Sequence, residues 1–140
     1  MKKLLLALAI GTASLVSFSS CTKEYITNIT PGVSYVYNVD PNDWERITNG
    51  DIVNYRVTIN VPDLKDYIFE DGHVDVSMLL DSNPNTYENI PATIDDYHYS
   101  ANYSIGKVTI YAEYRGSSAT ALSPEKALVK VVLTESEIGN

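Results

Sequence analysis

Alternating apolar and polar positions are the dominant pattern along this chain. In the clearest run, Val53 to Val61, apolar side chains occupy every second position and polar side chains stand between them. Successive residues of a strand point to opposite faces, so this period of two predicts an antiparallel strand with one buried and one solvated face. Helical spacing does not produce such a pattern.

Further strands are predicted by the same alternation. The runs are Val33 to Val39, Val74 to Leu80, Tyr97 to Ile105, Val108 to Tyr114 and Ala127 to Leu133. The alternation changes phase across Gly106-Lys107, which indicates a tight hairpin there. A weaker strand is expected from Tyr87 to Thr93, at a sheet edge, because Pro91 has no amide hydrogen to donate.

One short helix is predicted between these strands. Asp63 is its expected N-cap, and Gly72 stands just past its end. The apolar residues at helical spacing are Leu64, Tyr67 and Ile68. About seven short strands and one short helix in residues 33–140 predict an all-β fold, an antiparallel β-sandwich of immunoglobulin-like or fibronectin-like kind.

The first 20 residues have the three-part form of a secretory signal. Lys2 and Lys3 form its charged start, and an apolar stretch follows from Leu4 to Phe18. This stretch is too short to span a bilayer comfortably, since about 20 apolar residues are needed. We therefore predict that residues 1–20 are a cleaved export signal.

The end of this signal, Phe18-Ser19-Ser20-Cys21, resembles the lipobox of bacterial lipoproteins. The resemblance implies that Cys21, the only cysteine, carries a lipid anchor, and ordinary secretory cleavage nearby is the alternative. Two or three acyl chains hold a protein stably at a membrane, whereas one gives only marginal binding. A single thiol also excludes an internal disulfide bond.

The residues after Cys21 bear on location. Thr22-Lys23-Glu24 resembles a partial form of the lysine-plus-acid surface-export signal of Bacteroidetes lipoproteins. This resemblance implies outer-membrane anchoring, with the cell surface favoured over the periplasmic face. Residues 21–32 have no clear period and end in Thr30-Pro31-Gly32, which predicts a flexible tether between lipid and domain.

The chain as a whole resembles a large group of uncharacterised small lipoproteins from Bacteroidetes. The segments that carry this likeness are Pro41 to Trp44, Val61 to Leu64, Ile68 to Val74, Ile90-Pro91, Gly106 to Tyr111 and Val131 to Thr134. Their character is structural, so the resemblance implies a fold and an envelope location but no activity.

Charge and motifs exclude several function classes. The formal net charge is −8, and loss of residues 1–20 with Lys2 and Lys3 would make it −10, which disfavours nucleic acid and anionic lipid headgroups as partners. The sequence has no Gly-x-Ser-x-Gly elbow, no paired-histidine zinc motif and no phosphate loop. Asp95 and Asp96 would point to opposite faces of a strand and so could not act as a carboxylate pair. We therefore expect no enzyme and no cofactor.

Oxygen-bearing side chains alternate in one polar segment, as they do in a calcium-binding loop. They are those of Asp81, Asn83 and Asn85. The glycine that lets an EF-hand loop turn is missing, and these residue types also favour ordinary turns. The turn is the favoured interpretation, and the three residues are weak candidates for a metal site.

Aromatic side chains are the candidate ligand contacts. Trp44, in a polar loop, could stack on a sugar or anchor a protein, but the favoured alternative is a plug over the open end of the sandwich. Tyr87 and Tyr111 are expected either to contact a ligand or to protect a sheet edge. The other strand tyrosines are expected in the core: Tyr35, Tyr37, Tyr55, Tyr97, Tyr99, Tyr103 and Tyr114.

Together these observations predict a lipid-anchored module that presents a surface to a protein or glycan partner. A structural or assembly subunit of an outer-membrane complex or appendage, in contact through strand edges, is the alternative.

Overall fold

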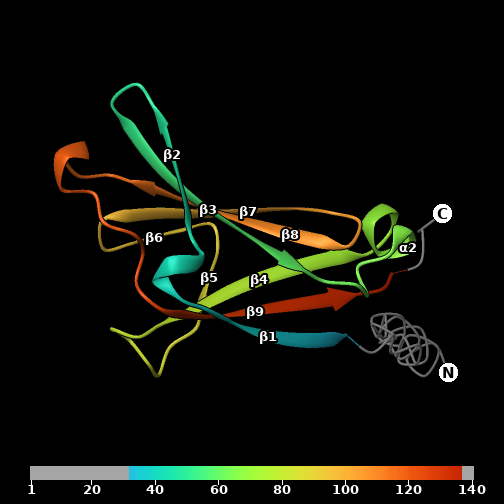
Figure 1. Cartoon of the computed structure of the whole chain (residues 1–140). Coiled ribbons are helices and arrows are strands. Elements are labelled where there is room, and N and C mark those ends of the chain that lie inside the picture. The colour runs from blue at the N-terminus through green and yellow to red at the C-terminus, as the bar shows by residue number, and fades with distance from the viewer. Residues whose placement is uncertain (1–31, 137–140) are drawn as a thin grey trace, which may run out of the picture.

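The structure, a computed structural model, describes residues 32–136, which form two antiparallel sheets packed face to face (Figure 1). The first sheet, in the order β1-β9-β4-β5, contains β1 (Val33–Val39), β4 (His73–Leu80), β5 (Glu88–Asn89) and β9 (Ala127–Thr134). The second, in the order β2-β3-β8-β7-β6, contains β2 (Glu45–Asn49), β3 (Ile52–Asn60), β6 (Ala92–Ile94), β7 (Tyr97–Ser104) and β8 (Lys107–Tyr114). The predicted all-β sandwich is confirmed. The predicted signal, Cys21 and the tether up to residue 31 lie outside the described residues.

The core consists of the alternate positions that the sequence pattern picks out. In β3, β4, β8 and β9 every second side chain is buried between the sheets. Of the tyrosines expected in the core, Tyr55 and Tyr99 are buried, whereas Tyr103 is 37 % exposed and packs edge-on against Phe69. The prediction for Tyr103 was wrong because β7 runs past the edge of the core at that point.

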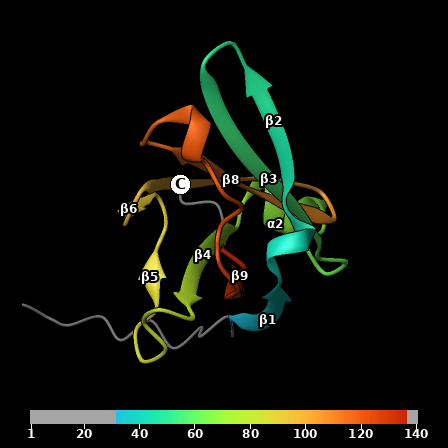
Figure 2. The ribbon, with the colours of Figure 1, turned by 60° about the vertical axis from the view of Figure 1, so that its left-hand side comes forward.

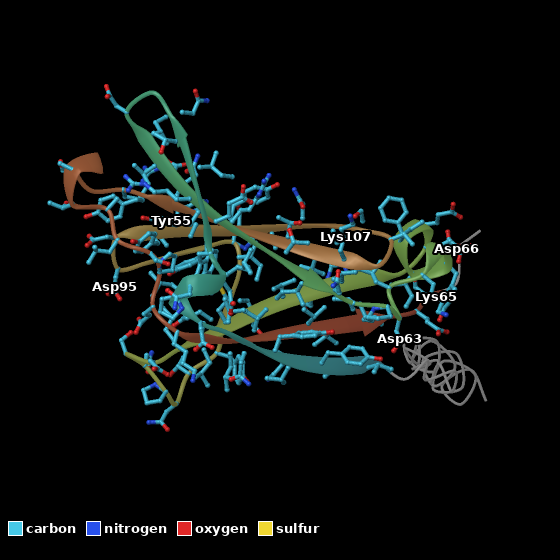
Figure 3. All side chains as sticks on the ribbon, in the orientation of Figure 1. Tyr55, Asp63, Lys65, Asp66, Asp95 and Lys107 are labelled. Atoms are coloured by element: carbon cyan, nitrogen blue, oxygen red, sulfur yellow. The ribbon has the colours of Figure 1, made fainter. Side chains whose placement is uncertain are left out.

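Strand register gives the sandwich two distinct ends. At the first, Val33 lies opposite Leu133, and Gly106 in the β7–β8 turn exchanges backbone hydrogen bonds with Val61 and Leu64. We call it the tether end, because β1 begins there. At the other, the distal end, Tyr97 lies opposite Tyr114. Figure 3 shows Asp63, Lys65, Asp66 and Lys107 at the tether end and Asp95 at the distal end.

The β2–β3 hairpin was not predicted from the sequence. Only Ile47 of β2 is apolar among polar neighbours, so no alternation marks the strand. Its turn is marked instead by Gly50, which has a positive φ of 62° between Asn49 and Ile52. The hairpin extends beyond the body of the sandwich (Figure 2).

The weaker strand predicted from Tyr87 to Thr93 is two strands in different sheets. β5 pairs with β4 at the edge of the first sheet, and β6 pairs with β7 at the edge of the second. Pro91 stands between them, after a cis peptide bond. The expected edge position is confirmed, but the chain changes sheet at the proline instead of continuing in one.

The short helix α2 (Asp66–Glu70) begins later than predicted. Its N-cap is Lys65, and the expected cap, Asp63, instead accepts a hydrogen bond from the hydroxyl of Tyr35. A carboxylate engaged by a neighbouring strand is not free to cap the helix. The helix buries Ile68, and the amide of Gly72 closes its end by donating to the Ile68 carbonyl at 3.0 Å.

Candidate functional site

Trp44 lies in the core and not on a binding surface. It follows the 3-10 helix η1 (Pro41–Asp43), is 7 % exposed, and packs on Tyr99 with the ring centroids 6.3 Å apart. Its indole Nε1 is buried and donates to no other described residue. The structure therefore favours a core position for Trp44 over a ligand contact. Trp44, which was expected to plug the open end of the sandwich, belongs to the hydrophobic core.

Tyr87 and Tyr111 are both half-buried, but Tyr87 directly precedes β5 of the first sheet, whereas Tyr111 belongs to the second sheet. The ammonium nitrogen of Lys130 lies 3.6 Å from the centre of the Tyr87 ring, in a cation–π contact with β9. Tyr111 is on β8, opposite Arg56 of β3 and Ser100 of β7. The fold does not bring these two tyrosines together into one site, and their role as ligand contacts stays a prediction.

The segment with Asp81, Asn83 and Asn85 is a turn that forms hydrogen bonds within itself and to the connection between β8 and β9. The amide of Asn83 donates to the Leu80 carbonyl at 3.0 Å, and the amide and hydroxyl of Ser82 both donate to the carboxylate of Glu125. Within residues 32–136, no cluster of three or more acidic, histidine or cysteine side chains could hold a metal ion. This geometry favours the turn interpretation.

Asp95 and Asp96 do not occupy strand positions, so the sequence argument about them was wrong. They form the turn between β6 and β7, and Asp95 has a positive φ of 51°. The Asp96 carbonyl accepts a hydrogen bond from the amide of Arg115 at 2.7 Å. As turn residues they both line one pocket, where the strand interpretation had placed them on opposite faces.

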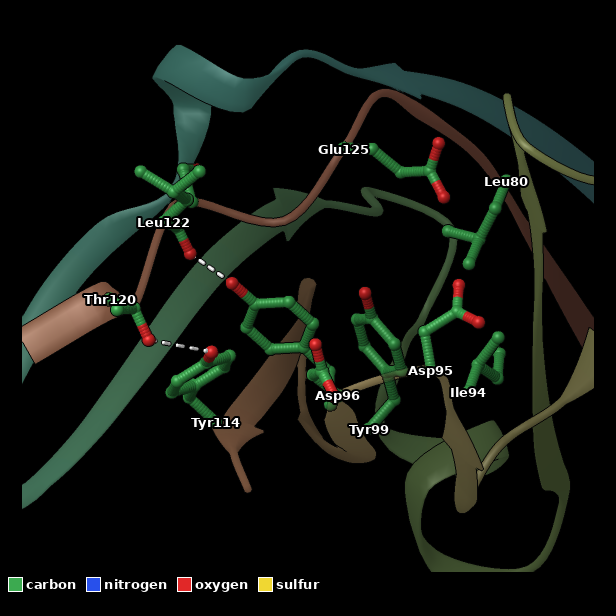
Figure 4. A pocket seen from close by; sticks show the side chains of 11 residues that line it. Leu80, Ile94, Asp95, Asp96, Tyr99, Tyr114, Thr120, Leu122 and Glu125 are labelled. Atoms are coloured by element: carbon green, nitrogen blue, oxygen red, sulfur yellow. Dashed lines mark hydrogen bonds between the residues drawn. The ribbon is translucent and has the colours of Figure 1, made fainter. Parts of the chain in front are cut away.

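This distal pocket, the candidate functional site, has a volume of about 320 Å³ (Figure 4). Its walls come from β4, the end of β6 with the turn that follows it, β7, β8 and the connection from β8 to β9, at residues 115–126. The lining residues are Leu80, Ile94, Asp95, Asp96, Tyr97, Tyr99, Tyr114, Thr120, Leu122, Ser123 and Glu125. Aromatic and apolar walls with a few convergent polar groups are typical of ligand sites.

Tyrosine hydroxyls attach the β8–β9 connection to the second sheet. The Tyr55 hydroxyl donates to the Ala121 carbonyl at 3.3 Å, and the Tyr97 hydroxyl donates to the carbonyl of Leu122. Oxygen atoms of the Tyr114 and Thr120 hydroxyls lie 3.2 Å apart. Because an aliphatic side chain could not make these bonds, the high tyrosine content of the chain has a structural use at this end.

Burial and neighbouring groups raise the pKa of two pocket tyrosines, Tyr97 and Tyr99. Burial, followed by the nearby Tyr55, Tyr114 and Asp96, raises the pKa of Tyr97 to about 12. The pKa of Tyr99 is raised as well, chiefly by burial and further by Tyr97, Glu125 and Asp95. Tyr97 and Tyr99 therefore offer hydroxyl groups and not phenolates at neutral pH.

Tyr99 is the pocket tyrosine whose hydroxyl has no hydrogen-bond partner among the described residues. Its side chain is 1 % exposed, and Figure 4 shows its hydroxyl directed into the pocket beside the carboxylate of Asp95. Unlike Tyr97 and Tyr114, it makes no hydrogen bond with another residue of the described range. The hydroxyl opens into the pocket, so it is free to bond to a ligand there.

Sequence reasoning missed this pocket because its residues come from five segments, and only the Asp95-Asp96 turn could have indicated it. No family model, no curated protein and no solved structure matches the chain. The resemblance to Bacteroidetes lipoproteins therefore stays a prediction. Within the part of the chain that the structure describes, none of the helices is long and apolar enough to cross a membrane.

Proposed function

We propose that the protein is a lipid-anchored, non-enzymatic binding module of the outer membrane, which presents the distal pocket to a protein or glycan partner. The observation that carries this proposal is the position of the pocket. It opens at the end of the sandwich opposite Val33, where the domain begins. An anchor at Cys21 would hold the tether end near the lipid and leave the pocket facing away from it.

The surface of the tether end supports this orientation. Exposed apolar side chains gather there from β1, α2 and the β7–β8 hairpin: Val33, Tyr67, Phe69, Tyr103 and Ile105. Aromatic and apolar groups are favourable at a membrane interface. A short tether would keep this surface close to the lipid. If the export signal at Thr22-Lys23-Glu24 acts as the resemblance implies, that lipid is the outer face of the outer membrane.

The pocket lining favours binding over catalysis. It contains carboxylates, hydroxyls and apolar side chains, but no histidine, cysteine or lysine. Nucleophilic catalysis requires a nucleophile beside a base that activates it. The hydroxyls of Tyr97 and Ser123 donate to the backbone carbonyls of Leu122 and Pro41 and not to a pocket carboxylate, so neither forms such a pair.

Glycan and peptide arrays test the proposal when they are probed with the protein and a blocked variant. Leu122 is 77 % exposed at the pocket rim, so Leu122→Arg should leave the fold intact and place a guanidinium beside the pocket carboxylates. The matched control is Ile105→Arg, which adds the same charge at the tether end, where Ile105 is 55 % exposed. We expect Leu122→Arg to abolish retention and Ile105→Arg to keep it. Equal retention of the two variants would contradict a role for the pocket.

The anchor is tested separately by membrane fractionation. Cys21→Ala should move the protein from the membrane to the soluble fraction, because the acyl chains supply the attachment. Continued tight membrane attachment of this variant would contradict the lipid anchor.

An assembly subunit is the second candidate function, and the β1 edge favours it. β1 is the longest of the edge strands and contains no charged residue, whereas β2 and β5 contain charges and β5 and β6 are very short. Val36 is 54 % exposed on β1. Uncharged edges add strands readily, so sedimentation of the protein and of Val36→Lys tests this role. A monomer in both, with no partner recovered from native membranes, would contradict it.

A further inference from the structure

The distal pocket has an unbalanced negative charge. Asp95, Asp96 and Glu125 line it, and no lysine or arginine does. The nearest basic residues along the chain are already paired, Arg115 with Glu113 at 2.9 Å and Lys126 with Asp40 at 3.6 Å. Negative charges gathered around one cavity make the local electrostatic potential more negative, which attracts a positively charged ligand group.

The aromatic and apolar part of the lining suits a cation that is carried on an apolar stem. The rings of Tyr97 and Tyr114 are tilted against each other with centroids 5.3 Å apart, and the Tyr97 and Tyr99 rings lie 5.9 Å apart. Tyrosine faces attract cations, and the side chains of Leu80, Ile94 and Leu122 complete the wall. A charge carried on a short apolar stem would contact both kinds of surface.

The Tyr99 hydroxyl supplies the second, independent indication of a ligand. The Tyr99 side chain is 1 % exposed, its hydroxyl has no hydrogen-bond partner among the described residues, and Figure 4 shows that hydroxyl directed into the cavity beside Asp95. A neutral hydroxyl oxygen accepts a hydrogen bond, and an N–H donor on a cation fits this acceptor and the carboxylates together.

We propose that the distal pocket binds a primary ammonium or guanidinium group on an apolar stem, as carried by a lysine or arginine side chain or by a polyamine. The proposal rests on the proposed function and names the ligand class of the same site. The carboxylates of Asp95 and Asp96 attract the charge, the tyrosine faces contact it, and the Tyr99 hydroxyl accepts a hydrogen bond from it.

Titration calorimetry of the purified protein tests this ligand class with four probes. Nα-acetyl-lysine methylamide presents the ammonium as a protein would, and spermidine presents it as a free polyamine. The Nε-acetylated form of the first probe has the same stem without the charge, and a panel of neutral oligosaccharides represents the glycan class. We expect at least one cation to bind roughly tenfold more tightly than the neutral amide, and added salt to weaken it. The cation that binds more tightly shows whether the ligand group comes from a protein side chain or from a free polyamine.

The matched variants are two double substitutions that remove equal charge. Asp95→Asn with Asp96→Asn neutralises the pocket, and asparagine tolerates the left-handed backbone of position 95. Asp51→Asn with Asp75→Asn neutralises two exposed carboxylates outside the pocket. We expect the pocket pair to lower cation affinity by roughly tenfold or more and the control pair to change it little.

The other outcomes separate the two proposals. Equal affinity for the charged and acetylated probes, or equal loss in both double variants, would overturn the cation proposal. Neutral oligosaccharides that bind in place of the cations, and are lost in the pocket variant, would overturn it and leave the proposed function standing. No binding of any probe, together with no retention on the arrays, would overturn both.

Discussion

The two ends of the sandwich are closed by different means. At the tether end the backbone itself closes the fold, because the β7–β8 turn exchanges hydrogen bonds with Val61 and Leu64, and Gly72 fits against β9. At the distal end the tyrosine hydroxyls of Tyr55, Tyr97 and Tyr114 hold a long connection above a pocket. Backbone closure leaves little space, whereas side-chain closure leaves a cavity with polar groups around it.

The cavities at the two ends also differ in their free polar groups. The tether-end cavity is smaller, about 190 Å³, and the hydroxyl of Tyr35 donates to the carboxylate of Asp63 within it. In the distal pocket, the hydroxyl of Tyr99 has no such partner among the described residues. This difference supports the proposal that a ligand binds at the distal end and not at the tether end.

The largest effect is expected from Trp44→Ala, which removes the core support of the distal end. Trp44 is 7 % exposed and packs on Tyr99 beneath the pocket, so its truncation should lower the free energy of unfolding by about 3–5 kcal/mol. Urea unfolding followed by circular dichroism measures this loss. A change near zero, together with lost ligand binding, would instead identify Trp44 as a surface contact.

Gly72→Ala and Gly116→Ala compare the two ends directly. A Cβ at Gly72 would lie 2.5 Å from the backbone oxygen of Thr134, so we expect a loss of about 1–3 kcal/mol in the free energy of unfolding. A Cβ at Gly116 would lie 2.5 Å from the hydroxyl of Tyr114, a side chain that can move. Gly116→Ala should therefore cost less stability but alter pocket binding, and equal losses in urea unfolding would contradict the difference between the ends.

Tyr97→Phe tests the attachment of the β8–β9 connection. Loss of the hydrogen bond to Leu122 should lower the free energy of unfolding by about 1 kcal/mol at neutral pH. The pKa of Tyr97 is raised from 10.0 to about 12, so the folded protein keeps a proton that the unfolded chain loses. The stabilisation is complete below pH 10 and declines as the pH rises towards 12.

Urea unfolding at a series of alkaline pH values measures this difference. The gap in stability between the protein and Tyr97→Phe should narrow as the pH rises through that range. A gap that stays constant would show that the Tyr97 proton is not linked to folding.

The smallest change in stability is expected from Tyr99→Phe. The hydroxyl that it removes has no described partner, so the free energy of unfolding should change by less than about 0.5 kcal/mol. Affinity for a pocket ligand should fall, because the acceptor is lost. Thermal melting and calorimetry measure the two effects, and a clear loss of stability would mean that this hydroxyl has a structural role.

Regular strands could be predicted from the sequence because one side of each is buried. The alternation from Val53 to Val61 and from Ala127 to Leu133 follows directly from that burial. β2 gave no such signal, since Ile47 is its single apolar residue, although Gly50-Asp51, the two-residue loop between Asn49 and Ile52, is a common hairpin turn. Asp63 was misassigned because its partner, Tyr35, lies 28 residues earlier in the chain.

The pocket could not be predicted in the same way. Asp96 continues the polar phase of the following strand, and the turn depends on a positive φ at Asp95 that is uncommon for residues other than glycine. The bond from the Arg115 amide to Asp96 is a long-range contact. Residues that meet only through such contacts leave no periodic pattern in the sequence.

The most direct test of the division between the two ends is a map of amide chemical shifts by two-dimensional NMR during titration with spermidine. The account predicts that the shifts change at the β6–β7 turn and along residues 120–125, with the pattern absent in Asp95→Asn with Asp96→Asn. Changes centred on α2 and the β7–β8 hairpin would contradict it, because they would place the binding site at the tether end.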